Sequence, residues 1–222
     1  MSSQIRVGLV DGDLEMRAGR RMMLDATRET TVVFEENSVA TVLEKFDDYL
    51  IDVLVVDQRL RSMSGTDLIA ALTRIKLKTG NLTKLLLTAP YGSKKLTISA
   101  LQAGASAVIT QDEPSKSLVE RIKRLHAGES QFSIEYMREA LMELKQPTRQ
   151  DHAFEAFLES LLPDTRQILQ LVIHGQTIQS VAKEKDIAAY RARKVVETAL
   201  DQLQICTLEQ LQLRYLNLEL NT

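Results

Sequence analysis

Residues 52–65 read DVLVVDQRLRSMSG: an apolar run between two aspartates, then a polar turn that ends at a glycine. The run from Val53 to Val56 is continuously apolar, as expected for a strand that is buried on both faces. Such strands occur in parallel sheets that carry helices on both sides. The stretch therefore predicts a central strand with Asp57 at its carboxyl end.

Four more short apolar runs flank this stretch, and segments with helical periodicity alternate with them. The predicted strands are IRVGLV (5–10), TVVFEE (31–36), DVLVVD (52–57), TKLLLTA (83–89) and SAVIT (106–110), and the predicted helices span 14–26, 38–46, 66–76, 93–104 and 115–128. Ser38 and Thr66 are the expected helix caps, and the methionines at helical spacing are expected in the core. The alternation predicts an α/β fold: a doubly wound, five-stranded parallel sheet of the flavodoxin-like kind.

The strand signal ends after Gly128. Residues 133–146 have helical periodicity, residues 147–152 form a polar break, and the pattern from there to the end is all-helical. We therefore expect a sheet domain over 1–128, a linker with a helix over 129–153, and a small all-α domain over 154–222.

Composition limits the function classes. The 222 residues carry a net charge of −2, and residues 151–222 hold 7 Lys+Arg against 10 Asp+Glu, so nucleic-acid binding requires a local basic patch. Cys206 is the only cysteine, which excludes an intrachain disulfide and favours the cytoplasm. No apolar run is long enough to span a bilayer, and the first residues lack the apolar core of a signal peptide. We expect a cytoplasmic protein without a membrane partner.

Polar residues follow three of the predicted strands at their carboxyl ends. Asp11 follows the first strand, Asp57 ends the third and Thr88 lies at the end of the fourth. Ligands of open α/β sheets bind beyond these strand ends. Two carboxylates there can share a magnesium ion, and a carboxylate beside the metal can accept a phosphoryl group.

This ordered set resembles the receiver domain of bacterial two-component response regulators over residues 4–127. The residues that carry the resemblance are LVDGD (9–13), VVDQRLRSMSG (55–65), LLLTA (85–89) and GASAVITQD (104–112). The resemblance implies that Asp57 is the phospho-acceptor position, that Gly65 is the glycine eight residues after it, and that Thr88 is the hydroxyl residue of the site.

Several positions depart from that family's pattern. Gly12 replaces the second of two adjacent acidic residues, and Asp13 is displaced by one position. Gln111 stands where the family has a lysine, Val108 where it has an aromatic switch residue, and Arg61 where it has a proline. The resemblance thus implies an atypical, degenerate receiver that no longer switches by phosphorylation, with at most a weak Mg²⁺ site at Asp11 and Asp57. A plainer alternative remains: Asp-Gly is a common turn, and Asp13 is a suitable cap for the helix that follows.

The helical half contains two helices joined by a tight turn, predicted at 177–186 and 188–203. Over residues 158–216 the sequence resembles the DNA-binding domain of LuxR/NarL-type regulators, with a helix-turn-helix. This implies that promoter DNA contacts Lys183, Arg191, Arg193 and Lys194, with Glu197 diluting the patch. Cys206, Leu208, Leu211 and Leu213 are expected either to form a dimer seam or to close the core.

These features together predict a transcription regulator without catalytic activity or a cofactor. It is expected to bind promoter DNA as a homodimer, and a protein or small-molecule signal is expected to replace phosphorylation. Two alternatives stay open: a conventional regulator that is phosphorylated on Asp57, and a protein-interaction module that has lost DNA binding.

Overall fold

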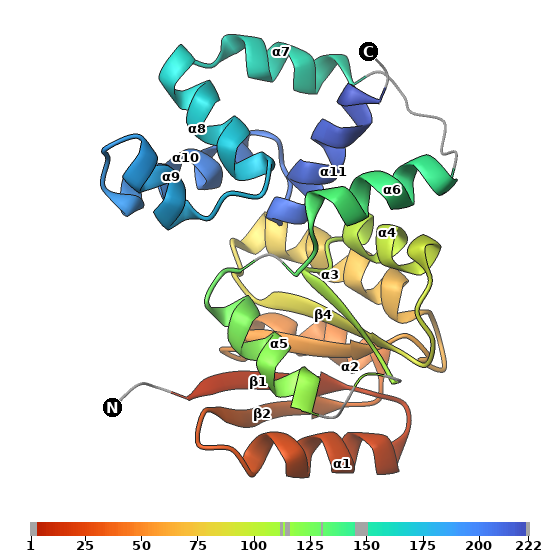
Figure 1. Ribbon diagram of the computed structural model, residues 1–222. Coiled ribbons are helices and arrows are strands. Elements are labelled where there is room, and N and C mark those ends of the chain that lie inside the picture. The colour runs from red at the N-terminus through yellow and green to blue at the C-terminus, as the bar shows by residue number, and fades with distance from the viewer. Residues whose placement is uncertain (1–3, 112, 114–115, 130, 145–150, 221–222) are drawn as a thin grey trace. The chain divides into compact units, whose positions relative to one another are not determined.

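The computed structural model describes residues 4–111, 113, 116–129, 131–144 and 151–220. Its chain divides into two compact units, Met1–Gln131 and Phe132–Thr222 (Figure 1). Within the described residues, no helix combines the length and the apolar character needed to cross a membrane.

The first unit is built on a five-stranded parallel sheet in the order β2-β1-β3-β4-β5. The strands are β1 (Ile5–Val10), β2 (Thr30–Glu36), β3 (Val53–Asp57), β4 (Lys84–Ala89) and β5 (Ala107–Thr110). The helices are α1 (Leu14–Asp25), α2 (Val39–Lys45), α3 (Gly65–Thr79), α4 (Lys94–Ala103) and α5 (Lys116–His126), with a short 3-10 turn, η1, at Phe46–Asp48. The predicted doubly wound α/β fold is confirmed.

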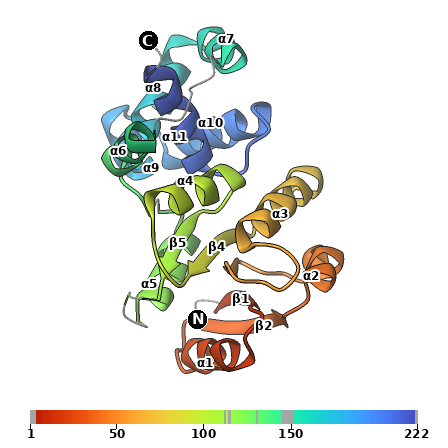
Figure 2. The same cartoon turned by 90° about the vertical axis from the view of Figure 1, so that its right-hand side faces the viewer.

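Helices cover both faces of this sheet, and Figure 2 shows α1 and α5 on one side and α2, α3 and α4 on the other. The strand β3 explains why both faces are apolar: Val53 and Val55 pack with Leu24 of α1 and Ile122 of α5, while Leu54 and Val56, equally buried, alternate with them toward the opposite face. Burial on both faces accounts for the continuous apolar run in the sequence.

The start of α3 differs from the prediction. Ser64, not Thr66, is the cap: its Oγ accepts the backbone N–H of Asp67 (3.1 Å), and the helix begins at Gly65. Thr66 instead donates its N–H and its hydroxyl to the side-chain oxygen of Gln58 (3.1 and 2.9 Å). A Cβ on Gly65 would collide with the Asp57 carbonyl oxygen, so only glycine lets this turn close against the end of β3.

The methionine expectation holds only in part. Met137 is fully buried and Met23 packs against the core of the first unit, but Met16, Met22 and Met142 are exposed, Met22 by 74%. Helical periodicity alone does not decide which of two adjacent apolar residues turns inward.

The second unit is all-helical, as predicted. Its helices are α6 (Ile134–Leu144), α7 (His152–Ser160), α8 (Pro163–Ile173), α9 (Ile178–Glu184), α10 (Ala189–Gln202) and α11 (Leu208–Glu219). Phe154, Leu169, Val181 and Val196 belong to one core cluster that joins α7 to α10. Leu211 also lies in this core, so this leucine closes the unit, as one of the two expectations for the last helix had it.

Candidate functional site

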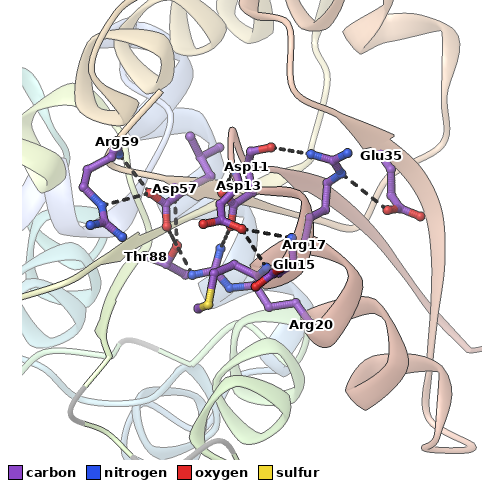
Figure 3. A network of polar contacts seen from close by, with 11 residues as sticks. Asp11, Asp13, Glu15, Arg17, Arg20, Glu35, Asp57, Arg59 and Thr88 are labelled. Atoms are coloured by element: carbon purple, nitrogen blue, oxygen red, sulfur yellow. Dashed lines mark hydrogen bonds and ion pairs between the residues drawn. The ribbon is translucent and has the colours of Figure 1, made fainter. Parts of the chain in front are cut away.

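The carboxyl ends of β1, β3 and β4 bring Asp11, Asp57 and Thr88 together (Figure 3). The register pairs Asp57 with Thr88 across neighbouring strands, and the Thr88 hydroxyl donates to Asp57 Oδ2 (3.1 Å). All three side chains are buried. We call these three residues, together with the arginine described next, the acidic corner.

Arg20 of α1 is the central cation of the acidic corner, and the sequence did not single it out. Its Nη1 contacts Asp11 Oδ2, and its Nη2 lies 3.1 Å from Asp57 Oδ2. The Arg20 side chain is only 10% exposed. One guanidinium therefore bridges the two carboxylates that a metal ion would otherwise share.

Two further arginines support the same site from its edges. Arg17 donates from Nη1 to the Asp11 carbonyl oxygen (2.6 Å), and its Nε lies 3.7 Å from Glu35 Oε2. The backbone N–H of Arg59 donates to Asp57 Oδ1 (2.9 Å). Asp57 thus accepts from a hydroxyl, a backbone amide and a guanidinium, which together compensate one buried negative charge.

Asp11 is held differently from Asp57. Burial raises the pKa of the Asp11 carboxyl above its ordinary value, against the opposing effects of the Asp13 N–H, which donates to Asp11 Oδ1 (2.9 Å), and of Arg20. Because burial favours the protonated form of Asp11, the contact with Arg20 matters most where this group is ionised.

Asp13 and Gly12 contribute little to the acidic corner. The Asp13 carboxylate caps α1 by accepting the N–H groups of Glu15 (2.9 Å) and Met16 (3.1 Å). A Cβ at Gly12 would make only an ordinary contact, 3.5 Å from the Arg59 carbonyl oxygen. Close contacts therefore do not require a glycine at position 12; this sequence simply lacks a carboxylate there.

The remaining positions of the implied pocket lie on β5 or just beyond it. Val108 is buried within the sheet. Gln111 is exposed, and its backbone N–H bonds the Ala89 carbonyl oxygen (3.0 Å) at the strand end. Arg61 lines, with Arg59 and Asn37, an open cavity of ≈ 590 Å³ above the acidic corner.

The donor set of the acidic corner does not fit a magnesium ion. Magnesium requires several oxygen ligands in octahedral geometry, but Asp13 is engaged as a helix cap and Arg20 already bridges the other two carboxylates. Among the residues that the structure describes, no group of three His, Cys, Asp or Glu side chains is placed to hold a metal ion.

The second candidate surface lies on α9 and α10. A tight turn joins the two helices; in it Asp186 has a left-handed φ of 49°, and the Ile187 N–H bonds the Ala182 carbonyl oxygen (2.9 Å). Asp is one of the few non-glycine residues that adopt this conformation readily. The geometry is that of two helices and a turn, with α10 in the second position.

Cations cover the outer side of α10. Arg191, Arg193 and Lys194 are exposed, whereas Ala192 between them is fully buried in the core. Lys183 on α9 is exposed, and so is Glu197 one turn along α10. The structure therefore brings the four predicted DNA-contacting residues to the surface of one helix pair. We call these four residues the basic surface.

Comparison with known proteins gives a family match for the first unit. The family model of the response regulator receiver domain matches residues 7–123, which is more than half of the chain. The response regulator protein VraR of Staphylococcus aureus is 25% identical over 201 residues, which cover 90% of this chain and 91% of VraR.

Two further matches extend over nearly the full length. The DNA-binding transcriptional activator DevR/DosR of Mycobacterium tuberculosis is 27% identical over 199 residues, which cover 90% of this chain and 88% of the relative. A solved structure of the RcsB response regulator of Salmonella typhimurium, described for its DNA interaction, has a TM-score of 0.52 at 16% identity and covers 97% of this chain and 98% of its own. At that identity the RcsB likeness concerns the two-part fold alone.

Proposed function

The chain belongs to the response regulator receiver domain family, and on that premise we propose that it is a LuxR/NarL-type transcription regulator whose receiver switches without phosphorylation of Asp57. It binds promoter DNA through the basic surface, as a homodimer on paired half-sites. We propose that the protein has no catalytic activity, holds no resident cofactor and is located in the cytoplasm.

The bridging position of Arg20 is the observation that carries this proposal. A divalent ion at the acidic corner would have to displace a guanidinium that is 10% exposed and bound to both carboxylates. Removing one partner from a buried ion-pair arrangement costs about 3–5 kcal/mol. Arg20 thus supplies a permanent positive charge at the place where phosphorylation of a receiver needs a divalent metal ion that can bind and leave.

The residue at position 111 adds to this argument. A glutamine there lacks the ammonium that would pair with a phosphoryl group on Asp57, a charge-assisted contact of about 1.5–3 kcal/mol. A phosphoryl group would therefore lack both its metal and its lysine.

The DNA-binding part of the proposal is supported by the exposure of Arg191, Arg193 and Lys194 on α10 and by the similarity to DevR/DosR, a DNA-binding transcriptional activator. Arginine contacts guanine edges bidentately or anchors on phosphates. Glu197 opposes phosphate on the same helix, which predicts moderate rather than very tight nonspecific binding.

Phosphorylation is tested by incubating the full chain with Mg²⁺ and acetyl phosphate and recording intact mass. We expect no mass gain in the wild type. A gain of one phosphoryl group that disappears in Asp57→Asn would overturn the proposal and favour the conventional regulator. A conventional regulator of this kind would still have the hydrogen bond from the Thr88 hydroxyl to Asp57 Oδ2.

DNA binding is tested by immunoprecipitation of the protein with its genomic DNA, followed by a salt titration on one recovered promoter fragment. We expect the binding constant to fall steeply with salt, because phosphate contacts release counterions. If no salt-dependent binding occurs at low ionic strength, the protein is an interaction module instead.

A further inference from the structure

A second cavity lies in the first unit, between α1 and the carboxyl ends of β4 and β5. It measures ≈ 620 Å³, within the range of small-molecule pockets. Met16 and Met23 of α1, Ile109 of β5 and Leu118 of α5 supply apolar walls. Methionine side chains adapt their shape, so this wall can follow the outline of an apolar molecule.

One end of this cavity is polar and touches the acidic corner. Arg20 and Thr88 line the cavity as well as contacting Asp57, and Gln111 lines the same end. The bonds from Arg20 to Asp11 and Asp57 use two of the five N–H groups of a guanidinium. This end of the cavity therefore offers hydrogen-bond donors from Arg20 and from the Gln111 amide.

The charges around the cavity favour an uncharged occupant. Arg20 already faces two carboxylates, and Glu113 pairs with Arg121 (3.2 Å). Glu15, the third charged side chain of the described lining, is exposed to solvent and would give a cation only a weak surface pair. A ligand anion would meet no uncompensated cation among the described lining residues, and burying an unpaired charge is costly.

Gly19 supports the same interpretation. It lies in the interior of α1 and lines the cavity, and a Cβ built there would meet no atom within 4 Å. No close contact requires a glycine, although glycine costs helix stability of about 0.5–1 kcal/mol relative to alanine. Gly19 is exposed, so the missing side chain leaves this edge of the cavity open to solvent.

We propose that the cavity between α1 and α5 binds a small, uncharged, mainly apolar molecule whose carbonyl group accepts hydrogen bonds from Arg20 and Gln111. Because Arg20 also bridges Asp11 and Asp57, a molecule that binds Arg20 in the cavity also affects the contacts of the acidic corner. The inference rests on the proposed function, since the bound molecule supplies the signal that phosphorylation does not.

Prodan, an uncharged fluorescent naphthyl ketone, is the probe for this site in the full chain. We expect saturable binding of one Prodan per chain. Gly19→Leu places a large side chain on the lining of the cavity and should raise the dissociation constant about tenfold or more. Ala18→Leu is the matched control: it places a leucine at the neighbouring position, which is exposed as Gly19 is but does not line the cavity, and should leave binding unchanged.

Anilinonaphthalene sulfonate, of similar size but anionic, tests the chemical class and should bind more weakly than Prodan at the Gly19-sensitive site. The proposal is overturned if wild type shows no saturable Prodan binding, if Gly19→Leu binds as wild type does, or if the sulfonate binds this site as tightly as Prodan. The titration needs neither phosphate nor DNA, so its failure is separate from failure of the proposed function.

Discussion

The acidic corner and the basic surface use arginine in opposite ways. Arg20 of the acidic corner and Arg17 at its edge are turned inward and paired with Asp11, Asp57 and Glu35, so ion pairs within the first unit neutralise their charge. On α10, Arg191 and Arg193 are exposed, and within the described chain no ion pair engages them. Paired cations hold a structure in one state, whereas unpaired ones attract an external partner. The difference fits a structural role for the first set and the DNA-binding role that we propose for the second.

The largest expected effect comes from removing the bridging cation. Arg20→Met leaves Asp11 and Asp57 buried without their shared guanidinium, and should destabilise the receiver by about 3–5 kcal/mol in urea denaturation. Arg21→Met is the matched control, because Arg21 is half exposed and its loss should cost less than about 1 kcal/mol. Equal losses in the two variants would show that Arg20 has no special role.

The same variant sharpens the contrast with magnesium. If Arg20 takes the place of the metal, Mg²⁺ should raise the melting temperature of Arg20→Met and leave that of the wild type unchanged. Equal stabilisation of both proteins by Mg²⁺ would contradict the fixed-cation interpretation.

A smaller effect is expected on the basic surface. Arg193→Ala should weaken binding to a recovered promoter fragment by about 1–3 kcal/mol if the side chain reads a base, and by less, with a shallower salt slope, if it contacts a phosphate. Arg28→Ala removes an equally exposed cation from the first unit and serves as the control in the same binding titration. Loss of affinity in both variants alike would mean that net charge, not the helix-turn-helix, drives binding.

Two glycines in the first unit should respond oppositely to alanine. Gly19→Ala should stabilise the receiver by about 0.5–1 kcal/mol, because α1 gains helix propensity and the new Cβ meets open space. Gly65→Ala should destabilise it by about 1–3 kcal/mol, since its Cβ would press on the backbone of Asp57. Denaturation midpoints of the two variants decide this, and a loss in Gly19→Ala would show that the glycine is needed for the helix itself.

The smallest effect concerns pH, because the influences on Asp11 partly cancel. The folded pKa of Asp11 is raised, so the folded state binds this proton more tightly than the unfolded state. Its contribution to stability is therefore complete below about pH 4 and is lost as pH rises through the folded pKa. From pH 4 upward, the unfolding free energy of the wild type should fall relative to that of Asp11→Asn. A rise of the wild-type value relative to the variant would mean that the folded pKa of Asp11 is lowered, not raised.

Much of the fold follows from sequence patterns with a direct physical cause. Strand β3 was predictable because burial on both faces demands a continuous apolar run, and the parallel register then places Asp57 beside Thr88. The glycine at position 65 was predictable from the family pattern, and its cause is the close approach to the end of β3.

Arg20 was not predictable in the same way. Three arginines occur within Arg17–Arg21, and which one points into the sheet edge depends on how α1 is rotated against β1 and β2. Packing fixes that rotation, as the inward Leu24 and the outward Met22 illustrate. The closest available signal was a cluster of arginines on the helix that follows Asp11, without a way to choose among them.

Helix α6 limits where a fragment of the chain that contains the second unit can begin. It buries Ile134, Met137, Ala140 and Leu141, and its Arg138 pairs with Glu219 of α11 (2.8 Å). A gene fragment that begins after this helix would retain the basic surface but would lose the packing of α6 against α11 and the ion pair to Glu219. A fragment made to test the proposed DNA binding should therefore begin near Phe132, where the second compact unit starts, well before the first residue of the helix-turn-helix resemblance.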